Sequence, residues 1–352
     1  MTAFRPVLFA LALLLFCGSP LPVLAASPET KEVVVYNWSE YIPQDVLDDF
    51  TKETGIKVVY STFESNEAMY AKVKLLRGRD YDVVVPSTYF VELLREEKLI
   101  QPLDLSRISN FSNLDPSLLN QDYDPGNAYS IPYMCGIMGL AYNTKYIKPG
   151  TLTSWKDLLN PELKGKIILT DDLRDAFGLA LLAQGHSVNS VDPAEIRQAS
   201  EFLTRLKASV RVFDVTAIKQ ALISEEVWTG PIWNGDYLVA REENPDLAFL
   251  FPKEGGIPWV DSFVLTSGAA NVENAYAFIN YMLRPEVALR CMEEFKYTSP
   301  NLAAVNLLPP DLRQNPILLP GPEERTQAEY IGSIGKALDV YEKYWEQIKT
   351  LR

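Results

Sequence analysis

The chain has 352 residues, of which 47% are hydrophobic, and its formal net charge at pH 7 is −13. Such an acidic chain disfavours nucleic acid, which binds proteins through clustered lysine and arginine. The single histidine, His186, excludes a His-dependent catalytic triad and a multi-histidine zinc site. A chain of this length can bury a hydrophobic core of its own and is expected to form about two domains.

Residues 1–26 are expected to be a signal peptide that is removed on export. Arg5 gives a positive start, "VLFALALLLF" is an apolar stretch of the length that signal peptides use, and "PLPVLAAS" ends in small residues. We expect cleavage near Ala25 or Ala26, which changes the net charge to −14 because Arg5 is lost. No later stretch approaches the roughly 20 apolar residues of a membrane-spanning helix. The mature protein is therefore expected to be exported.

The first part of the mature chain alternates strand-like and helix-like segments. "VVVY" is an apolar run typical of a buried strand, and Pro43 and Gly55 mark the beginning and the end of the helix that follows. Ser65 is placed to cap a second helix. Strands are expected at 33–36, 56–62 and 82–86, and helices at 43–55, 66–78 and 89–98. This alternation indicates a parallel sheet covered by helices.

The same alternation begins again near residue 166. The expected strands are 166–172, 225–233, 247–252 and 262–267, and the expected helices are 173–185, 195–208 and 271–295, the last one broken near Pro285. Between the two units lies "YSIPYMCGIMGLAYN", residues 129–143. Its Gly136 and Gly139 are expected in an extended crossover that bends between two lobes. The sequence therefore predicts an α/β protein with two α/β units.

Aromatic and acidic side chains gather just after the predicted strands, which is where open α/β sheets bind ligands. Three tryptophans lie two or three residues before a carboxylate, in the pairs Trp38/Glu40, Trp233/Asp236 and Trp259/Asp261. The other side chains that follow these strands include Ser39, Tyr41, Ser87, Thr88, Tyr89, Asp171, Asp172 and Asn234. Aromatic faces attract ammonium groups, and carboxylates bind them through charge-assisted hydrogen bonds. The pattern favours a site for a cationic ligand.

A purely structural interpretation stands beside this one. A tryptophan near a strand end commonly packs against a helix, and an aspartate there commonly caps one. Trp155, Trp228 and Trp345 have no neighbouring carboxylate at a strand end and are interpreted as structural. Cys135 and Cys291 are expected to be free, buried thiols, because a chain of this size needs no disulfide.

An exported carbohydrate-active enzyme is a second alternative, because paired carboxylates beside tryptophans also describe glycoside hydrolases. Asp172 with Asp175, or Asp261 opposite Glu40, would then act as acid and base. The sequence contains no phosphate-binding loop, no dinucleotide-binding fingerprint and no GxSxG motif. "DYDPGN", residues 122–127, lacks most of a calcium-binding loop and is interpreted as a turn. A binding protein for another cationic solute also stays open.

Several long stretches resemble the periplasmic polyamine-binding proteins, the spermidine/putrescine receptors of ATP-driven (ABC) importers. The stretches are "YNWSEY", "FTKETGIKVVYSTFESNEAMYAK", "YDVVVPSTY", "NFSNLDPSLLN", "YSIPY", "LTDDLRD", "IWNGD", "PKEGGIPWVDS" and "YTSPNLAA". The resemblance covers essentially the whole mature chain. It implies a binding protein without enzymatic activity, cofactor or metal, which works as a monomer with a polyamine ligand and a membrane permease as partners.

The resemblance also implies a two-lobed, type II periplasmic-binding-protein fold with the polyamine in the cleft between the lobes. Lobe 1 is expected to comprise residues 27–139 plus 260–304, and lobe 2 residues 140–259 plus 305–352. Crossover strands would join them.

Carried over position by position, the resemblance assigns a set of ligand-binding residues. Trp233 and Trp259 would enclose the methylene chain, and Asp261 would take an ammonium group. The remaining implied positions are Trp38, Ser39, Glu40, Tyr41, Ser87, Tyr89, Asp172, Asp175 and Tyr297. Two positions depart from spermidine binders similar to this chain: Asp175 replaces a glutamate, and Ile331 stands where a glutamine is expected. Both changes weaken contacts to a ligand nitrogen and leave the choice between spermidine and putrescine open.

Overall fold

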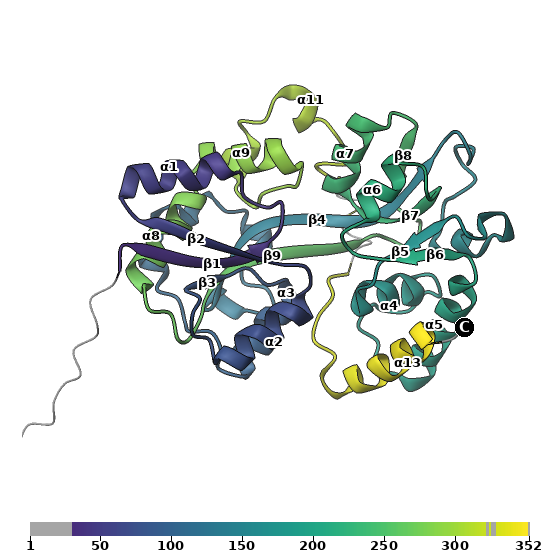
Figure 1. Ribbon diagram of the computed structural model, residues 1–352, viewed down its shortest axis with the longest axis horizontal. Helices are drawn as coiled ribbons and strands as arrows, with labels where there is room; N and C mark the ends of the chain where they lie inside the picture. Colours follow the sequence, from purple (N-terminus) through teal and green to yellow (C-terminus); the bar gives the residue numbers. More distant parts are fainter. Residues whose placement is uncertain (1–29, 322–323, 325–328, 351–352) are drawn as a thin grey trace, which may run out of the picture.

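The structure is a computed structural model that describes residues 30–321, 324 and 329–350 (Figure 1). The expected signal peptide, residues 1–26, lies outside the described residues. Within the described part of the chain, no helix combines the length and the apolar character needed to cross a bilayer.

The first lobe is built from the strands and helices at the left of Figure 1. They are β1 (Glu32–Trp38), α1 (Gln44–Thr54), β2 (Lys57–Phe63), α2 (Asn66–Leu76), β3 (Val83–Val84), α3 (Thr88–Glu96) and α8 (Val272–Met282). Helix α1 buries Val46, Leu47 and Phe50 and ends at Gly55, whose φ of 72° is the left-handed conformation that glycine adopts easily. The Ser65 side chain caps α2 by accepting the Ala68 N–H, as the sequence predicts.

The second lobe lies at the right of Figure 1. Its elements are β5 (Ile167–Leu169), α4 (Leu173–Leu182), α5 (Pro193–Lys207), β6 (Val210–Phe213), α6 (Ile218–Ile223), β7 (Thr229–Trp233), α7 (Asn234–Glu243), β8 (Leu247–Leu250) and α13 (Leu338–Thr350).

Helices α9 (Pro285–Phe295), α10 (Leu302–Val305) and α11 (Pro310–Arg313) follow α8. Short 3-10 helices fill the connections: η1 (Leu105–Arg107), η2 (Ser109–Asn113), η3 (Pro116–Leu118), η4 (Pro125–Asn127), η5 (Trp155–Leu159), η6 (Pro161–Leu163) and η7 (Gly335–Ala337).

Two long strands, β4 (Ser130–Asn143) and β9 (Ile257–Leu265), run from one lobe into the other. The strand order is β2-β1-β3-β9-β4-β7-β5-β6, with β8 also paired to β4. The first half of β4 pairs antiparallel with β9, and from Met138 onward β4 pairs with β7 and β8. One hydrogen-bonded sheet therefore connects the lobes, and β4 and β9 cross between them (Figure 1).

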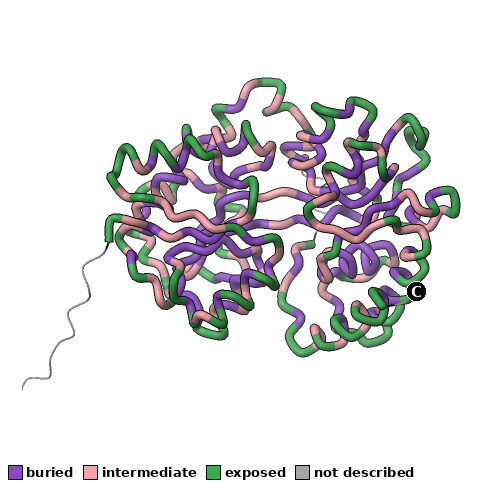
Figure 2. Tube along the Cα trace, viewed as in Figure 1, coloured by how far each residue is buried: buried purple, intermediate pink, exposed green. Residues whose placement is uncertain are grey.

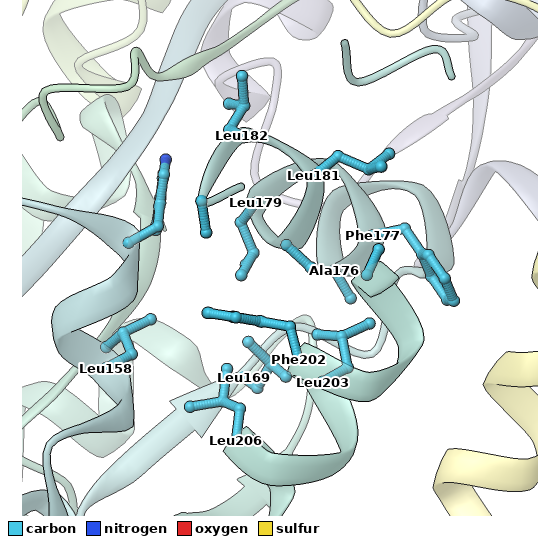
Figure 3. Close-up of a cluster of buried hydrophobic side chains, with 14 of the residues drawn as sticks. Leu158, Leu169, Ala176, Phe177, Leu179, Leu181, Leu182, Phe202, Leu203 and Leu206 are labelled. Atoms are coloured by element: carbon cyan, nitrogen blue, oxygen red, sulfur yellow. The ribbon is translucent and has the colours of Figure 1, made fainter. Parts of the chain in front are cut away.

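Each lobe has its own hydrophobic core, and Figure 2 shows buried chain concentrated in the middle of both. In the first lobe Val33, Val35 and Phe50 pack with Phe263 and Phe278. In the second lobe the main cluster lies between α4 and α5 and includes the labelled residues of Figure 3, among them Leu158, Leu169, Phe177, Phe202 and Leu206. A separate hydrophobic core in each lobe is expected of a two-lobed molecule. The lobe boundaries expected from the sequence, 27–139 plus 260–304 and 140–259 plus 305–352, stay predictions.

Some predicted elements differ from the structure in length. Residues 257–265 form one strand, β9, although only 262–267 was predicted, because the strand continues through Pro258 and Trp259 along β4. Strand β3 is only Val83–Val84, and β7 begins at Thr229. The helix expected at 271–295 is broken as predicted, into α8 and α9. Residues 122–127 form a turn that runs into η4, as predicted.

The two glycines of the crossover have a role that the sequence interpretation did not assign. Neither is among the glycines with positive φ, so no unusual bend depends on them. Instead, a Cβ at Gly136 would lie 2.7 Å from a ring carbon of Trp259, and a Cβ at Gly139 would lie 2.4 Å from the Phe249 ring. Both glycines therefore allow a neighbouring aromatic ring to lie against β4.

Candidate functional site

A cleft of about 740 Å³ lies between the lobes, and all twelve residues predicted from the sequence line it. The first lobe supplies Trp38, Ser39, Glu40, Tyr41, Ser87 and Tyr89; the second supplies Asp172, Asp175 and Trp233; Trp259 and Asp261 lie on β9, and Tyr297 follows α9. The carboxyl ends of β1, β3, β5 and β7 thus meet at one place, whereas Trp259 and Asp261 lie within the crossover strand β9. The cleft also includes residues that the sequence did not single out as ligand-binding, among them Glu64, Ser65, Asn66, Val215, Thr216, Lys219, Gln220, Ile257 and Pro258.

Asp261 is held by two hydroxyl donors from the first lobe. The Tyr41 hydroxyl donates to Oδ2 over 2.6 Å, and the Ser87 hydroxyl donates to Oδ1 over 2.6 Å. Asn66 in turn donates from Nδ2 to Ser87 Oγ, and its Oδ1 accepts the Ser87 N–H. Asn66 is a positioning residue that the sequence interpretation missed, because a single asparagine at a helix start has no distinctive pattern. Burial raises the pKa of Asp261 to about 6, although the two hydroxyl groups lower it.

The aromatic side chains form the walls of the cleft. The Trp259 and Tyr297 rings meet edge to face at 5.1 Å, and the Tyr41 ring is 5.8 Å from Tyr297. Trp259 pairs with Gly136 and Trp233 pairs with Met138, two residues further along β4. Paired residues share a face of a sheet, so both indoles project from the same face.

The second lobe contributes the α4 acid pair, Asp172 and Asp175, to the cleft lining. Asp172 is the N-cap of α4, and its Oδ1 accepts the Asp175 N–H over 2.9 Å. The capping interpretation therefore holds for Asp172, which nonetheless also lines the cleft. Burial, followed by the charges of Asp172 and Glu67, raises the pKa of Asp175 well above its usual range. Two desolvated carboxylates beside each other favour a bound cation, which would lower the cost of ionising both.

The cleft lining also contains the Lys219 ion-pair group, made of Lys219, Glu40 and Asp236. Lys219 Nζ is 2.8 Å from Glu40 Oε2 and 3.7 Å from Asp236 Oδ1. Glu40 has a φ of 50°, a left-handed conformation that non-glycine residues rarely adopt and that clusters at binding sites. Burial raises the pKa of Asp236, and Lys219 partly offsets this effect. Lys219 was missed because an isolated lysine in a short helix shows no motif.

The C-terminal segment closes one side of the cleft. Ile331 lines the cleft and is buried, and its carbonyl oxygen accepts the Thr88 hydroxyl over 3.1 Å. Arg174 holds the same segment by donating to the Gly332 carbonyl oxygen over 2.9 Å. An apolar side chain therefore lines the cleft at the position where the family resemblance implies a glutamine.

The residues interpreted as structural lie in other surroundings. Trp155 is fully buried and donates its indole N–H to the Gly255 carbonyl oxygen, and Trp228 stacks on Tyr146 at 4.8 Å. Trp345 packs against Phe177 and Phe213.

The two cysteines of the described chain, Cys135 and Cys291, are not joined by a disulfide. Only Cys291 is fully buried, because Cys135 lies on β4 with its side chain partly exposed. The expectation of two buried thiols is therefore wrong for Cys135.

Comparisons with known proteins agree with this architecture. The family model of bacterial extracellular solute-binding proteins matches residues 45–320. The spermidine/putrescine-binding periplasmic protein of Escherichia coli K12 is 44% identical over 328 residues, covering 93% of this chain and 94% of that protein. The putrescine-binding periplasmic protein PotF of the same organism is 31% identical and covers 92% of both chains.

A solved structure has the same fold. The spermidine/putrescine ABC transporter substrate-binding protein PotD from Streptococcus pneumoniae superposes with a TM-score of 0.80 and 36% identity, covering 91% of this chain and 99% of that one. The two-lobed binding-protein fold expected from the sequence is confirmed. The family consists of binding proteins, so the enzyme alternative is excluded and the cleft carboxylates do not serve catalysis. The chain belongs to the bacterial extracellular solute-binding protein family.

Proposed function

We propose that this protein captures a polyamine, spermidine or putrescine, in the cleft between its lobes and delivers it to the permease of an ABC importer. The observation that carries the proposal is the lining of the cleft, where three tryptophans meet six carboxylates supplied by both lobes. The carboxylates are Glu40, Glu64, Asp172, Asp175, Asp236 and Asp261. The names of the relatives in Escherichia coli and Streptococcus pneumoniae support the same ligand class.

The chemistry of a polyamine explains why these residue types are needed. Its ammonium groups are separated by flexible methylene segments, so the site must offer anionic groups along a flat apolar wall. In this proposal Trp233 and Trp259 enclose the methylenes, Asp261 takes one ammonium group, and the α4 acid pair takes another. Each contact of an ammonium group with an aromatic face is worth about 0.5–2 kcal/mol, and each hydrogen bond to a charged group about 1.5–3 kcal/mol.

Location and assembly belong to the same proposal. We infer that residues 1–26 are removed near Ala25 or Ala26 and that the mature protein works in the periplasm as a monomer. The apolar stretch near the N-terminus and the periplasmic names of the relatives support this location.

Isothermal titration calorimetry with putrescine, spermidine, an amino acid and a sugar tests the proposed ligand class. We expect at least one of the two polyamines to bind, and neither the amino acid nor the sugar to bind. Trp259→Ala should weaken that binding about tenfold or more by removing one aromatic wall. Asp261→Asn should weaken it by about 10- to 100-fold, because the charge that meets an ammonium group is lost.

Trp228→Ala is the matched control, because Trp228 stacks on Tyr146 and does not line the cleft. It should bind like the parent protein. Binding of the sugar or the amino acid but of neither polyamine would overturn the proposal, and so would parent-like affinity in both cleft variants. Mass spectrometry of any small molecule that copurifies gives an independent answer.

A further inference from the structure

Lys219 is the one cationic side chain among the described residues that line the cleft. It projects from α6 of the second lobe and contacts Glu40, which follows β1 of the first lobe, and Asp236, in the first turn of α7. Burial lowers the pKa of Lys219, but Asp236 and Glu40 raise it by more, so the pKa lies above its ordinary value. Lys219 is therefore charged at neutral pH and sits as an ammonium group between two cleft carboxylates.

Asp261 is linked to Tyr297 through Tyr41, because the Tyr41 hydroxyl donates to Asp261 over 2.6 Å and the Tyr41 and Tyr297 rings are 5.8 Å apart. Tyr297 in turn interacts with Asp236 and Glu40 of the Lys219 ion-pair group. Asp261 also interacts electrostatically with Asp175 of the α4 acid pair. Asp261 is therefore connected to both groups of carboxylates.

We propose that Lys219 makes the cleft selective for diamines over triamines by occupying the position of a third ammonium group. This inference rests on the proposed polyamine function. With Lys219 in place, the α4 acid pair and Asp261 are the cleft carboxylates, apart from the exposed Glu64, that form no ion pair within the described part of the chain, although Arg174 interacts electrostatically with the α4 acid pair. A diamine fills both. A triamine brings a third ammonium group to Glu40 and Asp236, where it meets the like charge of Lys219.

The selectivity arises from repulsion as well as from attraction. A site discriminates between two ligands by the difference in their binding free energies, and an unpaired like charge placed against the wrong ligand increases that difference. Lys219 and Asp236 are partly buried, with 24% and 23% of their side chains exposed, so solvent screens the repulsion near Asp236 less than at the surface. The Lys219 charge also offsets one of the two negative charges of Glu40 and Asp236 in the empty cleft, and thereby reduces the cost of holding several carboxylates together.

Calorimetric titration of the full chain with putrescine and with spermidine tests the inference. Lys219→Met removes the charge and should shift the ratio of the two dissociation constants toward spermidine by about tenfold or more. Lys219→Gln removes the same charge with a polar side chain and should shift the ratio in the same direction, which keeps the test valid if the methionine variant fails to fold. Lys219→Arg keeps the charge and should retain the ratio of the parent protein.

Lys145→Met is the matched control, because Lys145 also pairs with a glutamate, Glu225 at 3.0 Å, but lies outside the cleft lining. Its ratio should equal that of the parent. Binding of both polyamines to Lys219→Met and Lys219→Gln, with a ratio of dissociation constants that changes by less than about twofold, would overturn the role of Lys219 and leave the proposed function intact. If neither polyamine binds the parent or any variant, the proposed function itself is wrong.

Discussion

Asp261 illustrates how one buried residue sets the conditions under which the cleft attracts a cation. Its carboxylate is 5% exposed, both of its oxygens accept a hydroxyl, and its pKa is raised by burial to about 6. An ammonium ligand stabilises the ionised form, so the pKa of Asp261 falls when the ligand binds. Below pH 6 the empty site is therefore protonated, and binding must first release that proton.

We predict that the affinity for a polyamine is highest above about pH 6.5 and that protonation of Asp261 alone lowers it by up to about tenfold for each pH unit between 6 and 5. The sign follows from the direction of the shift, because a carboxyl group with a raised pKa loses its charge sooner as the pH falls. Asp175 has its pKa raised in the same direction and steepens the decline. Calorimetry at pH 7.5, 6.5, 5.5 and 5.0 gives the profile.

Two variants separate this titration from general acid destabilisation. Asp261→Asn should bind weakly at pH 7.5 and depend less on pH than the parent protein. Asp82→Asn changes an equally buried carboxylate that accepts the Val34 N–H and does not line the cleft, so it should keep the pH profile of the parent. An identical profile in Asp261→Asn would show that another group controls the pH dependence.

The crossover strands act as the support of the cleft at the scale of secondary-structure elements. Strands β4 and β9 pair along Ser130–Met138 and Ile257–Val264, and Trp259 lies in this paired region. Gly136 leaves room for the Trp259 ring, with 2.7 Å between its hypothetical Cβ and the nearest ring carbon. The position of a cleft wall thus depends on a residue that has no side chain.

Gly136→Ala should therefore weaken polyamine binding by about tenfold, because the new methyl group must displace the Trp259 ring or Asn234. Gly139→Ala is a matched control on the same strand, since its methyl group would meet the Phe249 ring instead. Both variants should lose stability, by about 1–3 kcal/mol. Titration calorimetry at a temperature below the unfolding transition measures the affinity of each folded variant. An equal loss of affinity in both variants would contradict a specific link between Gly136 and Trp259.

The molecule as a whole is arranged so that one ligand can contact both lobes. Contacts across the cleft include the Lys219–Glu40 ion pair and the hydrogen bond from Thr88 to the Ile331 carbonyl oxygen. The main hydrophobic cores of the two lobes, by contrast, are separate clusters. Relative motion of the lobes on the two crossover strands is the expected response to a ligand that bridges them.

We predict that spermidine or putrescine compacts the protein. A compact chain of this size has a radius of gyration of about 20 Å, and closure should reduce the value of the ligand-free protein by about 1 Å. Small-angle X-ray scattering with and without ligand measures the change. Asp261→Asn at the same ligand concentration should stay at the ligand-free value. A parent protein whose radius does not change on saturation would not support closure by bridging.

Much of the candidate site follows from local sequence patterns. Apolar runs, Pro43, Gly55 and the Ser65 cap locate strands and helices from nearest neighbours along the chain, and the carboxyl ends of parallel strands must share an edge. This reasoning places Trp38, Asp172 and Trp233 at strand ends without any knowledge of distant contacts. The resemblance to a known family added Tyr297 and Ile331, which no local pattern marks.

The sequence by itself therefore determined two α/β units and the aromatic and acidic character of the groups that lie at their strand ends. Only the tertiary structure showed that β9 extends through Trp259, that Asn66 positions Ser87, and that Lys219 reaches the cleft. The physical reason is that periodicity and capping act over a few residues, whereas Lys219 and Glu40 are 179 residues apart. Their interaction exists only because the sheet brings two lobes face to face.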